Sequence, residues 1–204
     1  MIRIYTLGTA GIAPALHAMR NPKDSWELSD TVMTDHGVVV GDNDTVLSLK
    51  LQKAGTEHHK HLRMIMVWAD IIAPRYWWTE FDTYRIGVEK ISCSTMHRLT
   101  ARPIRESDFS DDCADSFILH NLVDFMNEMM KKYHDEKDPD LKKQYWRTII
   151  QTLPQSYLQR RTVMMSYAAL RNIYRQRKGH KLEEWQQFRK WVEEELPCSW
   201  MIIE

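Results

Sequence analysis

The chain has 204 residues, a length that suits one domain with a sizeable buried core. Its 28 basic residues equal its 28 acidic residues, so no overall charge indicates nucleic acid or a membrane surface as a partner. No apolar run is long enough to cross a bilayer and no charged-then-apolar leader is visible, so we expect a cytoplasmic protein.

Cysteine spacing and local charge add two further limits. Cys93, Cys113 and Cys198 lie far apart and form no CxxC or zinc-type spacing, which favours reduced thiols. Residues 106–115 are acidic, whereas residues 160–181 are basic. An anionic partner is therefore expected at the basic region.

The N-terminal part predicts short strands and helices in alternation. Residues 1–7 alternate enough for a strand, residues 9–19 suit a helix, and residues 38–40 indicate a buried strand. The pair Gly8 and Gly11 is weak evidence for a phosphate loop, because the Lys-Ser/Thr that completes such a loop is missing.

A helix is predicted between the turn at residues 41–44 and Gly55. Asp44 or Thr45 can cap its start, and Gly55 suits its end. The side expected to face the core is apolar and consists of Leu47, Leu51 and Ala54.

Three histidines follow at His58, His59 and His61. Only His58 and His61 would share a helical face, and spacing places no third ligand, so we expect a solvated helix start and no metal site. The next apolar residues repeat at helical spacing and predict a helix over residues 62–72.

Residues 74–85 predict a helix that carries aromatic rings, two acids and two arginines. Rings stack and guanidinium groups bind phosphate, so this segment suits a planar anionic ligand. A buried aromatic helix with paired charges remains the alternative. Cys93, between two serines and four residues before His97, is a weaker candidate for a nucleophile.

The C-terminal half predicts long amphipathic helices over residues 117–133, 139–153, 159–177 and 182–196. Asp138-Pro139 is a favourable start for the second of these, and Gly179 separates the last two. The stripe expected to be buried in the first helix consists of Ile118, Leu122, Phe125, Met129 and Tyr133.

A basic cluster marks the end of the third of these helices, and it suits phosphate binding. A solvated basic face, favoured by the helix dipole, is the alternative. The cluster consists of Arg171, Arg175, Arg177, Lys178, His180 and Lys181.

These features resemble the flavin-dependent thymidylate synthases over about residues 47–105 and 153–191. His58 matches a flavin-contacting His of that family, and Pro74 matches a Pro before its motif helix. Arg85 matches the last residue of the Arg-His-Arg motif. In the later helix, Asn172 matches a flavin-side Asn and Arg177 matches the Arg that holds the nucleotide phosphate.

The resemblance implies an α+β fold of mostly long helices on a small mixed or antiparallel sheet, as a single domain over residues 1–204. It implies FAD as a cofactor, with His58, Arg85 and Asn172 beside the flavin and Arg177 at the phosphate of dUMP. If active, the chain would methylate dUMP with methylenetetrahydrofolate and NADPH, in a homotetramer with sites between subunits. We expect Arg85 and Arg177 to converge on one cleft.

Several motif positions depart from the family pattern. Thr83 and Tyr84 occupy the first two places of the Arg-His-Arg motif. In the later helix Ser166 and Ala168 replace an Asn and an Arg. Further departures are Val88 and Ile91 for a Ser and a Glu, Cys93 for a Ser, and Thr95 for an Arg. Whether the chain is an enzyme is therefore open, and a non-catalytic nucleotide-binding or protein-interaction module on the same fold is the alternative.

Overall fold

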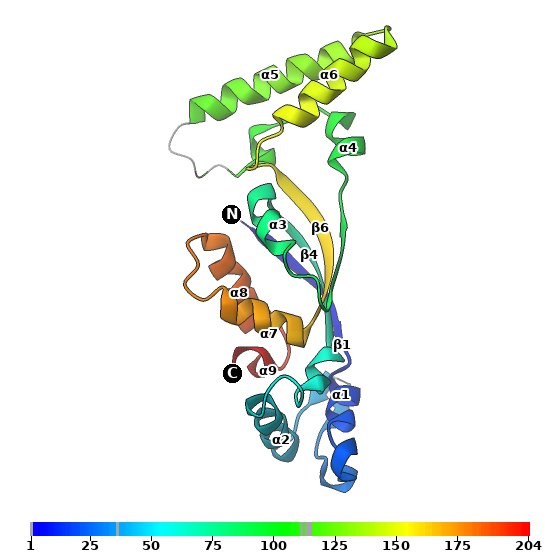
Figure 1. The fold of residues 1–204 in the computed structure, drawn as a ribbon, viewed down its shortest axis with the longest axis vertical. Coiled ribbons are helices and arrows are strands. Elements are labelled where there is room, and N and C mark those ends of the chain that lie inside the picture. The colour runs from blue at the N-terminus through cyan, green and yellow to red at the C-terminus, as the bar shows by residue number, and fades with distance from the viewer. Residues whose placement is uncertain (1, 36, 111, 113–115) are drawn as a thin grey trace. The chain divides into compact units, whose positions relative to one another are not determined.

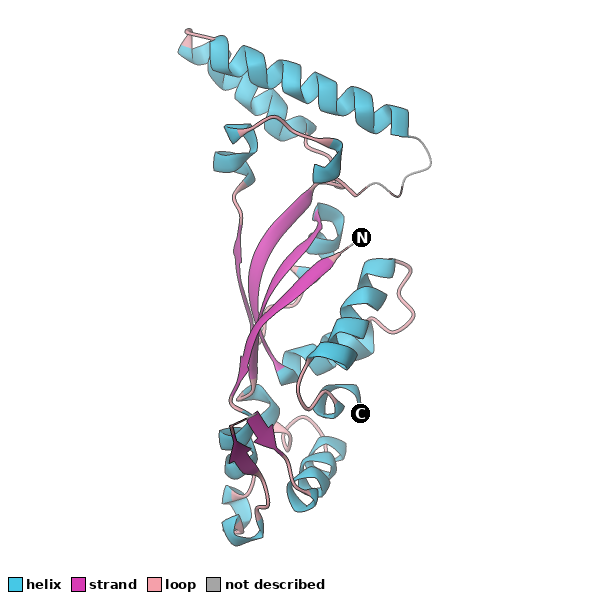
Figure 2. Ribbon diagram, turned by 180° about the vertical axis from the view of Figure 1, so that it is seen from behind, coloured by secondary structure: helices cyan, strands magenta, loops and turns pink. Residues whose placement is uncertain are grey.

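The computed structural model describes residues 2–35, 37–110, 112 and 116–204 (Figures 1 and 2). Cys113 and part of the acidic segment lie outside these ranges. The predicted α+β class is confirmed by a four-stranded sheet, a two-stranded sheet and many helices. Within the described ranges, no helix combines the length and the apolar character needed to cross a membrane.

The strands in chain order are β1 (Arg3–Ala10), β2 (Val32–Thr34), β3 (Gly37–Val39), β4 (Met66–Pro74), β5 (Val88–Ser92) and β6 (Leu158–Ser166). The helices are α1 (Ile12–Ala18), α2 (Asp42–Lys53), α3 (Arg75–Phe81), α4 (Thr95–Arg98), α5 (Ser116–Asp135), α6 (Pro139–Thr152), α7 (Tyr167–Gln176), α8 (Glu183–Glu195) and α9 (Trp200–Ile203). The short connections include a 3₁₀ helix, η3 (Lys60–Arg63).

The larger sheet has the strand order β1-β4-β6-β5. Backbone bonds that flank β4 and β6 run in opposite residue order: Arg75 N–H donates to Tyr157 O at 3.1 Å, and Tyr167 N–H donates to Ile65 O at 2.9 Å. These two central strands are therefore antiparallel. The smaller sheet, β2 and β3, is also antiparallel, but it is largely exposed, which contradicts the buried strand expected at residues 38–40.

Two segments predicted as helices contain strands. Residues 66–74 form β4, and residues 158–166 form β6. Both strands are central in the sheet, so apolar side chains on both faces of β4 are buried, and such a run does not show the alternation of a half-buried strand. The helix predicted over residues 159–177 begins only at Tyr167.

The residues fall into two compact units that interleave along the sequence. The first holds Ile71–Thr83 and Ile91–Arg161 together with the first residues of the chain. The second holds Ile4–Asp70, Tyr84–Lys90 and Thr162–Glu204. Each strand of the larger sheet contributes residues to both units.

In the first unit, α5 and α6 lie side by side (Figures 1 and 2). Their core includes Val123, Met126 and Ile149. The buried stripe of α5 is rotated from the expected one, since Ile118 and Phe125 are exposed. The predicted start of α6 is confirmed, because the Asp138 carboxylate accepts two backbone N–H groups of the first turn.

The aromatic helix α3 belongs to the core of the first unit. Trp77, Trp78 and Phe81 are fully buried, with ring centroids 4.9–5.4 Å apart. The guanidinium of Arg161 lies 4.3 Å from the Trp78 ring centroid and forms a 2.8 Å ion pair with Asp82. Residues 75–81 therefore form a buried aromatic helix, as in the alternative interpretation, and Asp82 directly after it is paired with Arg161.

In the second unit, α2 presents an unexpected face to the core. Asp44, Ser48 and Gln52 are buried, whereas Leu47 and Leu51 are only half-buried. The polar face can be buried because each of its side chains is hydrogen-bonded. The partners include Arg20 for Asp44, His61 for Ser48 and Arg171 for Gln52.

Candidate anion-binding site

A pocket of about 510 Å³ lies at the start of α7 in the second unit. This volume is within the range of small-molecule sites, about 300–1,000 Å³. None of its lining residues carries a carboxylate, and several carry a guanidinium or an imidazole. The lining residues are Thr56, His59, Arg63, Met66, Ile86, Gly87, Ser166, Ala168, Ala169, Arg171, Asn172 and Arg175.

Arg171 is the most buried charge in this pocket, with 6% of its surface exposed. Its Nη1 donates to Gln52 Oε1 at 2.5 Å and to Met201 O at 3.5 Å. Burial, followed by the nearby Arg175 charge, lowers the pKa of Arg171. Its hydrogen-bond partners among the described residues are neutral, and the nearby Glu204 charge offsets the effect of burial only in part, so a bound anion would compensate this guanidinium further.

Arg63 and Arg175 extend the positive surface outward from Arg171. Arg63 Nη2 donates to Thr56 O at 3.2 Å, and Arg175 Nη2 donates to a backbone oxygen of Glu204 at 2.8 Å. Both side chains are exposed. A guanidinium has five N–H groups, so each retains donors for a phosphate or carboxylate.

His59 adds an acceptor to the same pocket. Burial lowers its pKa, and the charges of Arg171 and Arg63 lower it further, so the imidazole is neutral at pH 7. The ring donates to the backbone of Gln52, while its buried Nδ1 has no hydrogen-bond partner in the described part of the chain. With the proton on the other nitrogen, Nδ1 can accept a hydrogen bond from a ligand.

Residues from the first turn of α7 also line this pocket. Ser166 caps the helix, its Oγ accepting from Ala169 N–H at 3.2 Å. Gly87 has φ of 71°, and a Cβ there would stand 2.5 Å from Ser166 Oγ. Glycine thus permits the close approach of this turn to the helix start, whose dipole favours an anion.

Of the residues expected at the flavin and phosphate, Asn172 lines this pocket and accepts from Gln176 Nε2 at 2.9 Å. His58 is exposed and lines a different pocket. Arg85 is exposed in the segment between α3 and β5, beyond the end of the helix predicted to contain it, and is not among the lining residues.

Arg177 lies at the C-terminal end of α7, away from the start of the helix. Its Nε donates to Tyr84 Oη at 2.8 Å, and its guanidinium lies 4.3 Å from the Trp185 ring centroid. A cation here is favoured by the helix dipole. The pockets beside α7, α2 and α5 are lined by neither Arg85 nor Arg177, and the convergence of these two residues on one cleft stays a prediction.

The other candidate groups do not form a site together. His61 is buried against Ser48, whereas His58 is exposed. Among the described residues, no three His, Cys, Asp or Glu side chains are grouped as a metal site needs. Cys93 is exposed beside the end of β5, and no hydrogen bond joins its side chain to His97 in the described chain.

His59 and Arg63 line the pocket although the sequence does not predict them as site residues. They lie four residues apart in a segment predicted as a helix start, but they belong to a loop and to η3. Arg171 and Arg175 were within the predicted basic cluster, and their helical spacing of four is the signal that places both on one face of α7.

No family model matches the sequence, and no curated protein matches it either. Solved structures do. The crystal structure of thymidylate synthase X from Helicobacter pylori with FAD and dUMP matches with a TM-score of 0.73 and 17% identity, over 100% of this chain and 98% of that one. A second structure of the flavin-dependent enzyme from the same organism, complexed with FAD and dUMP, matches with the same score and identity over 98% of both chains. This chain therefore has the fold of thymidylate synthase X.

Proposed function

We propose that the pocket at the start of α7 binds the phosphate-bearing part of a nucleotide, and that the chain is a divergent flavin-dependent thymidylate synthase-like protein. The observation that carries this proposal is the guanidinium of Arg171, buried against neutral partners beside two further arginines. A phosphate supplies further negative charge and accepts several N–H groups at once. The shared fold with structures that contain FAD and dUMP supports a nucleotide rather than another anion.

The residues of the pocket fit the anionic part of FAD. Arg63, Arg171 and Arg175 would hold phosphate oxygens, and the neutral His59 would accept a hydrogen bond from a ligand N–H or O–H group. Asn172, which also lines the pocket, would lie beside the flavin. The chemistry that FAD supplies when bound is hydride transfer, here for methylation of dUMP with methylenetetrahydrofolate and NADPH.

A homo-oligomer, as a tetramer in the cytoplasm, would complete the site. Ile86 lines the pocket yet is 94% exposed, as expected of an apolar residue that a second copy covers. The exposed His58 and Arg85 would then contribute to a flavin site shared between copies, and Arg177 to the nucleotide phosphate. Association would bring together residues that one chain keeps apart.

The second candidate is a nucleotide-binding module without catalysis. Ser166 and Ala168 both line the pocket, and they stand where the family has an Asn and an Arg. The pocket therefore lacks two donors of the family pattern, and each charge-assisted hydrogen bond is worth about 1.5–3 kcal/mol. Such losses can remove activity while leaving the fold and nucleotide binding.

The active enzyme and the non-catalytic module are distinguished by the visible absorption spectrum of the purified protein after incubation with FAD and gel filtration. Retained flavin absorbance, together with dTMP formation from dUMP, supports the enzyme. Colourless protein whose melting temperature rises with dUMP supports the module. Colourless protein that neither FAD nor dUMP stabilises contradicts both.

A further inference from the structure

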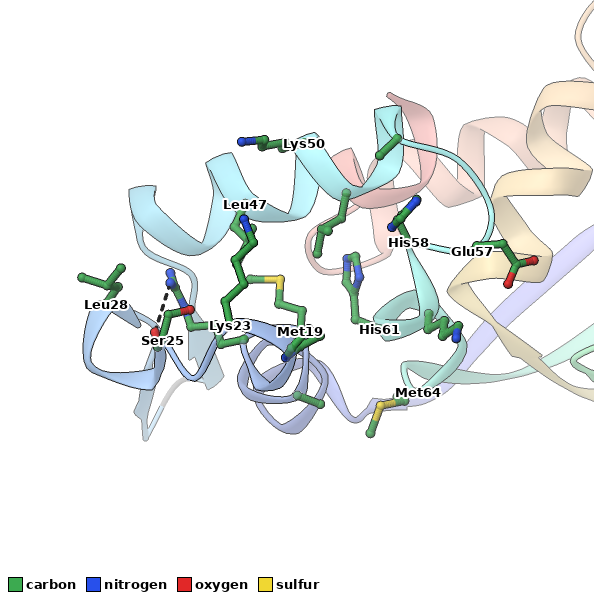
Figure 3. Close-up of a pocket in the computed structure, with 16 residues that line it drawn as sticks. Met19, Lys23, Ser25, Leu28, Leu47, Lys50, Glu57, His58, His61 and Met64 are labelled. Carbon is green, nitrogen blue, oxygen red and sulfur yellow. Dashed lines mark hydrogen bonds between the residues drawn. The ribbon is translucent and has the colours of Figure 1, made fainter.

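The apolar side of α2 faces a second pocket of about 570 Å³, in the same unit but on different residues (Figure 3). Leu47, Leu51 and Met19 contribute to its wall. This side of α2 was expected to pack in the core, but the helix buries Asp44, Ser48 and Gln52 instead. The pocket therefore presents apolar surface that the fold itself does not fill.

The mouth of this pocket is basic. Lys23, Lys50 and Lys60 line it and are exposed, and Glu57 is the one carboxylate among its lining residues. An apolar interior with cationic groups at its opening suits a ligand with an apolar body and an anionic group.

His61 provides a buried donor in the pocket wall. It is 3% exposed, and in Figure 3 its ring lies beneath α2 and points toward it. Gln52 Nε2 donates to Ser48 Oγ at 3.2 Å, and Ser48 Oγ lies 2.9 Å from His61 Nε2. The serine hydroxyl can then donate to Nε2, which places the imidazole proton on Nδ1. That Nδ1 is buried and has no partner among the described residues.

Arg20 provides a second such donor. It is 3% exposed, its Nε donates to Asp44 Oδ1 at 2.7 Å, and its Nη1 donates to Ser25 O at 3.4 Å. Its Nη2 is buried without a partner in the described part of the chain. Unpaired buried donors are rare because each costs free energy, and both of these belong to residues that line one pocket.

We propose that this pocket binds a small amphipathic carboxylate. The apolar chain of the ligand lies against Leu47, Leu51 and Met19. Its carboxylate lies in the field of the lysines at the mouth, and a shift of the Arg20 and His61 side chains toward the ligand brings their unpaired N–H groups within hydrogen-bond reach of it. This pocket shares no lining residue with the pocket of Arg171, although His58, proposed above to reach the flavin of another copy, stands among its lining residues.

Isothermal titration of the full-length protein with octanoate tests the proposal, with acetate and 1-octanol as probes of the two halves of the ligand. We expect saturable octanoate binding and much weaker binding of the other two. Absence of octanoate binding overturns the proposal. Acetate binding as tightly as octanoate, or 1-octanol binding as tightly, also overturns it.

Two pairs of variants locate the bound octanoate. Lys50→Glu should weaken binding about two- to fivefold, the effect expected of an exposed charge, whereas Lys53→Glu on the same helix but outside the pocket should not. Leu51→Trp should abolish binding by filling the pocket, and Leu51→Met should retain it. Circular dichroism confirms that each variant is folded. Equal effects of the two lysine variants, or unchanged affinity in folded Leu51→Trp, would place octanoate elsewhere and overturn the proposal.

Discussion

At Asp44, burial and hydrogen bonding act on one carboxylate in opposite directions. Burial acts to raise its pKa, but hydrogen bonds from Thr31, Ser29 and Arg20, together with the Arg20 charge, leave the pKa below its usual value. The carboxylate therefore remains charged inside the second unit, where Arg20 is its 2.7 Å ion-pair partner. Removal of either partner would leave a buried group uncompensated.

Asp44→Asn should lower the free energy of unfolding at pH 7 by about 2–4 kcal/mol, because Arg20 would lose its buried counter-charge. The control Asp42→Asn, exposed in the same first turn, should lower it by less than about 1 kcal/mol. Urea unfolding of the three proteins gives these differences.

The same series has a defined pH dependence. The folded-state pKa of Asp44 lies below the ordinary aspartate value of 3.8, so its stabilisation is present above that pH and is lost as pH falls through the folded-state pKa. The difference in free energy of unfolding between the original protein and Asp44→Asn should therefore become smaller as the pH falls below 3.8. Parallel stability curves down to low pH would contradict this assignment.

Among the helices and strands, the sequence predicts best those elements that bury only one face. The amphipathic patterns of α5, α6 and α8 and the cap at Asp138 were readable because polar and apolar sides separate at helical spacing. The strand β4 was not readable because both of its faces are buried, and β6, whose first five residues are half-buried or exposed, shows no clear alternation either. The burial of α2 depends on distant partners of its polar side, which no local pattern contains.

The turn before β5 offers a sharp test of element packing. Gly87 and Gly179 have φ of 71° and 72°, but only at Gly87 would an added Cβ lie within 4 Å of another part of the chain. Gly179→Ala should lower the free energy of unfolding by about 1–2 kcal/mol, the penalty of placing alanine in a left-handed backbone conformation. Gly87→Ala should lower the free energy of unfolding further, because its methyl group would displace Ser166 Oγ. Equal costs in thermal unfolding would show that the turn does not press against the start of α7.

At the scale of the whole molecule, the α+β fold was predictable, whereas the assembled site was only partly so. Arg171 and Arg175 come from one helix and stand out by spacing, while His59 and Arg63 come from the start and end of η3 and Gly87 comes from the turn before β5. Arg177 was assigned to the phosphate by resemblance, and its stacking on Trp185 could be learned only from the fold. Long-range arrangement, which the sequence does not encode locally, decides which basic residues meet.

The exposed Ile86 predicts that copies of the chain associate. Sedimentation should show a homo-oligomer, and Ile86→Asp should reduce its mass, because a charge would be buried between copies. Val46→Asp, at another exposed apolar residue, serves as the control and should leave the mass unchanged. A monomeric original protein would contradict the shared site.

The most direct test of the nucleotide site is the FAD affinity of Arg175→Ala beside that of Lys178→Ala, measured by isothermal titration. Both substitutions remove one exposed positive charge near the end of α7, but only Arg175 lines the pocket. We predict that Arg175→Ala weakens binding by about 1.5–3 kcal/mol, the value of a charge-assisted hydrogen bond, and that Lys178→Ala binds as the original protein does. Equal affinities in all three proteins, or no FAD binding by any of them, would contradict the placement of the cofactor phosphates in the pocket that Arg171 and Arg175 line.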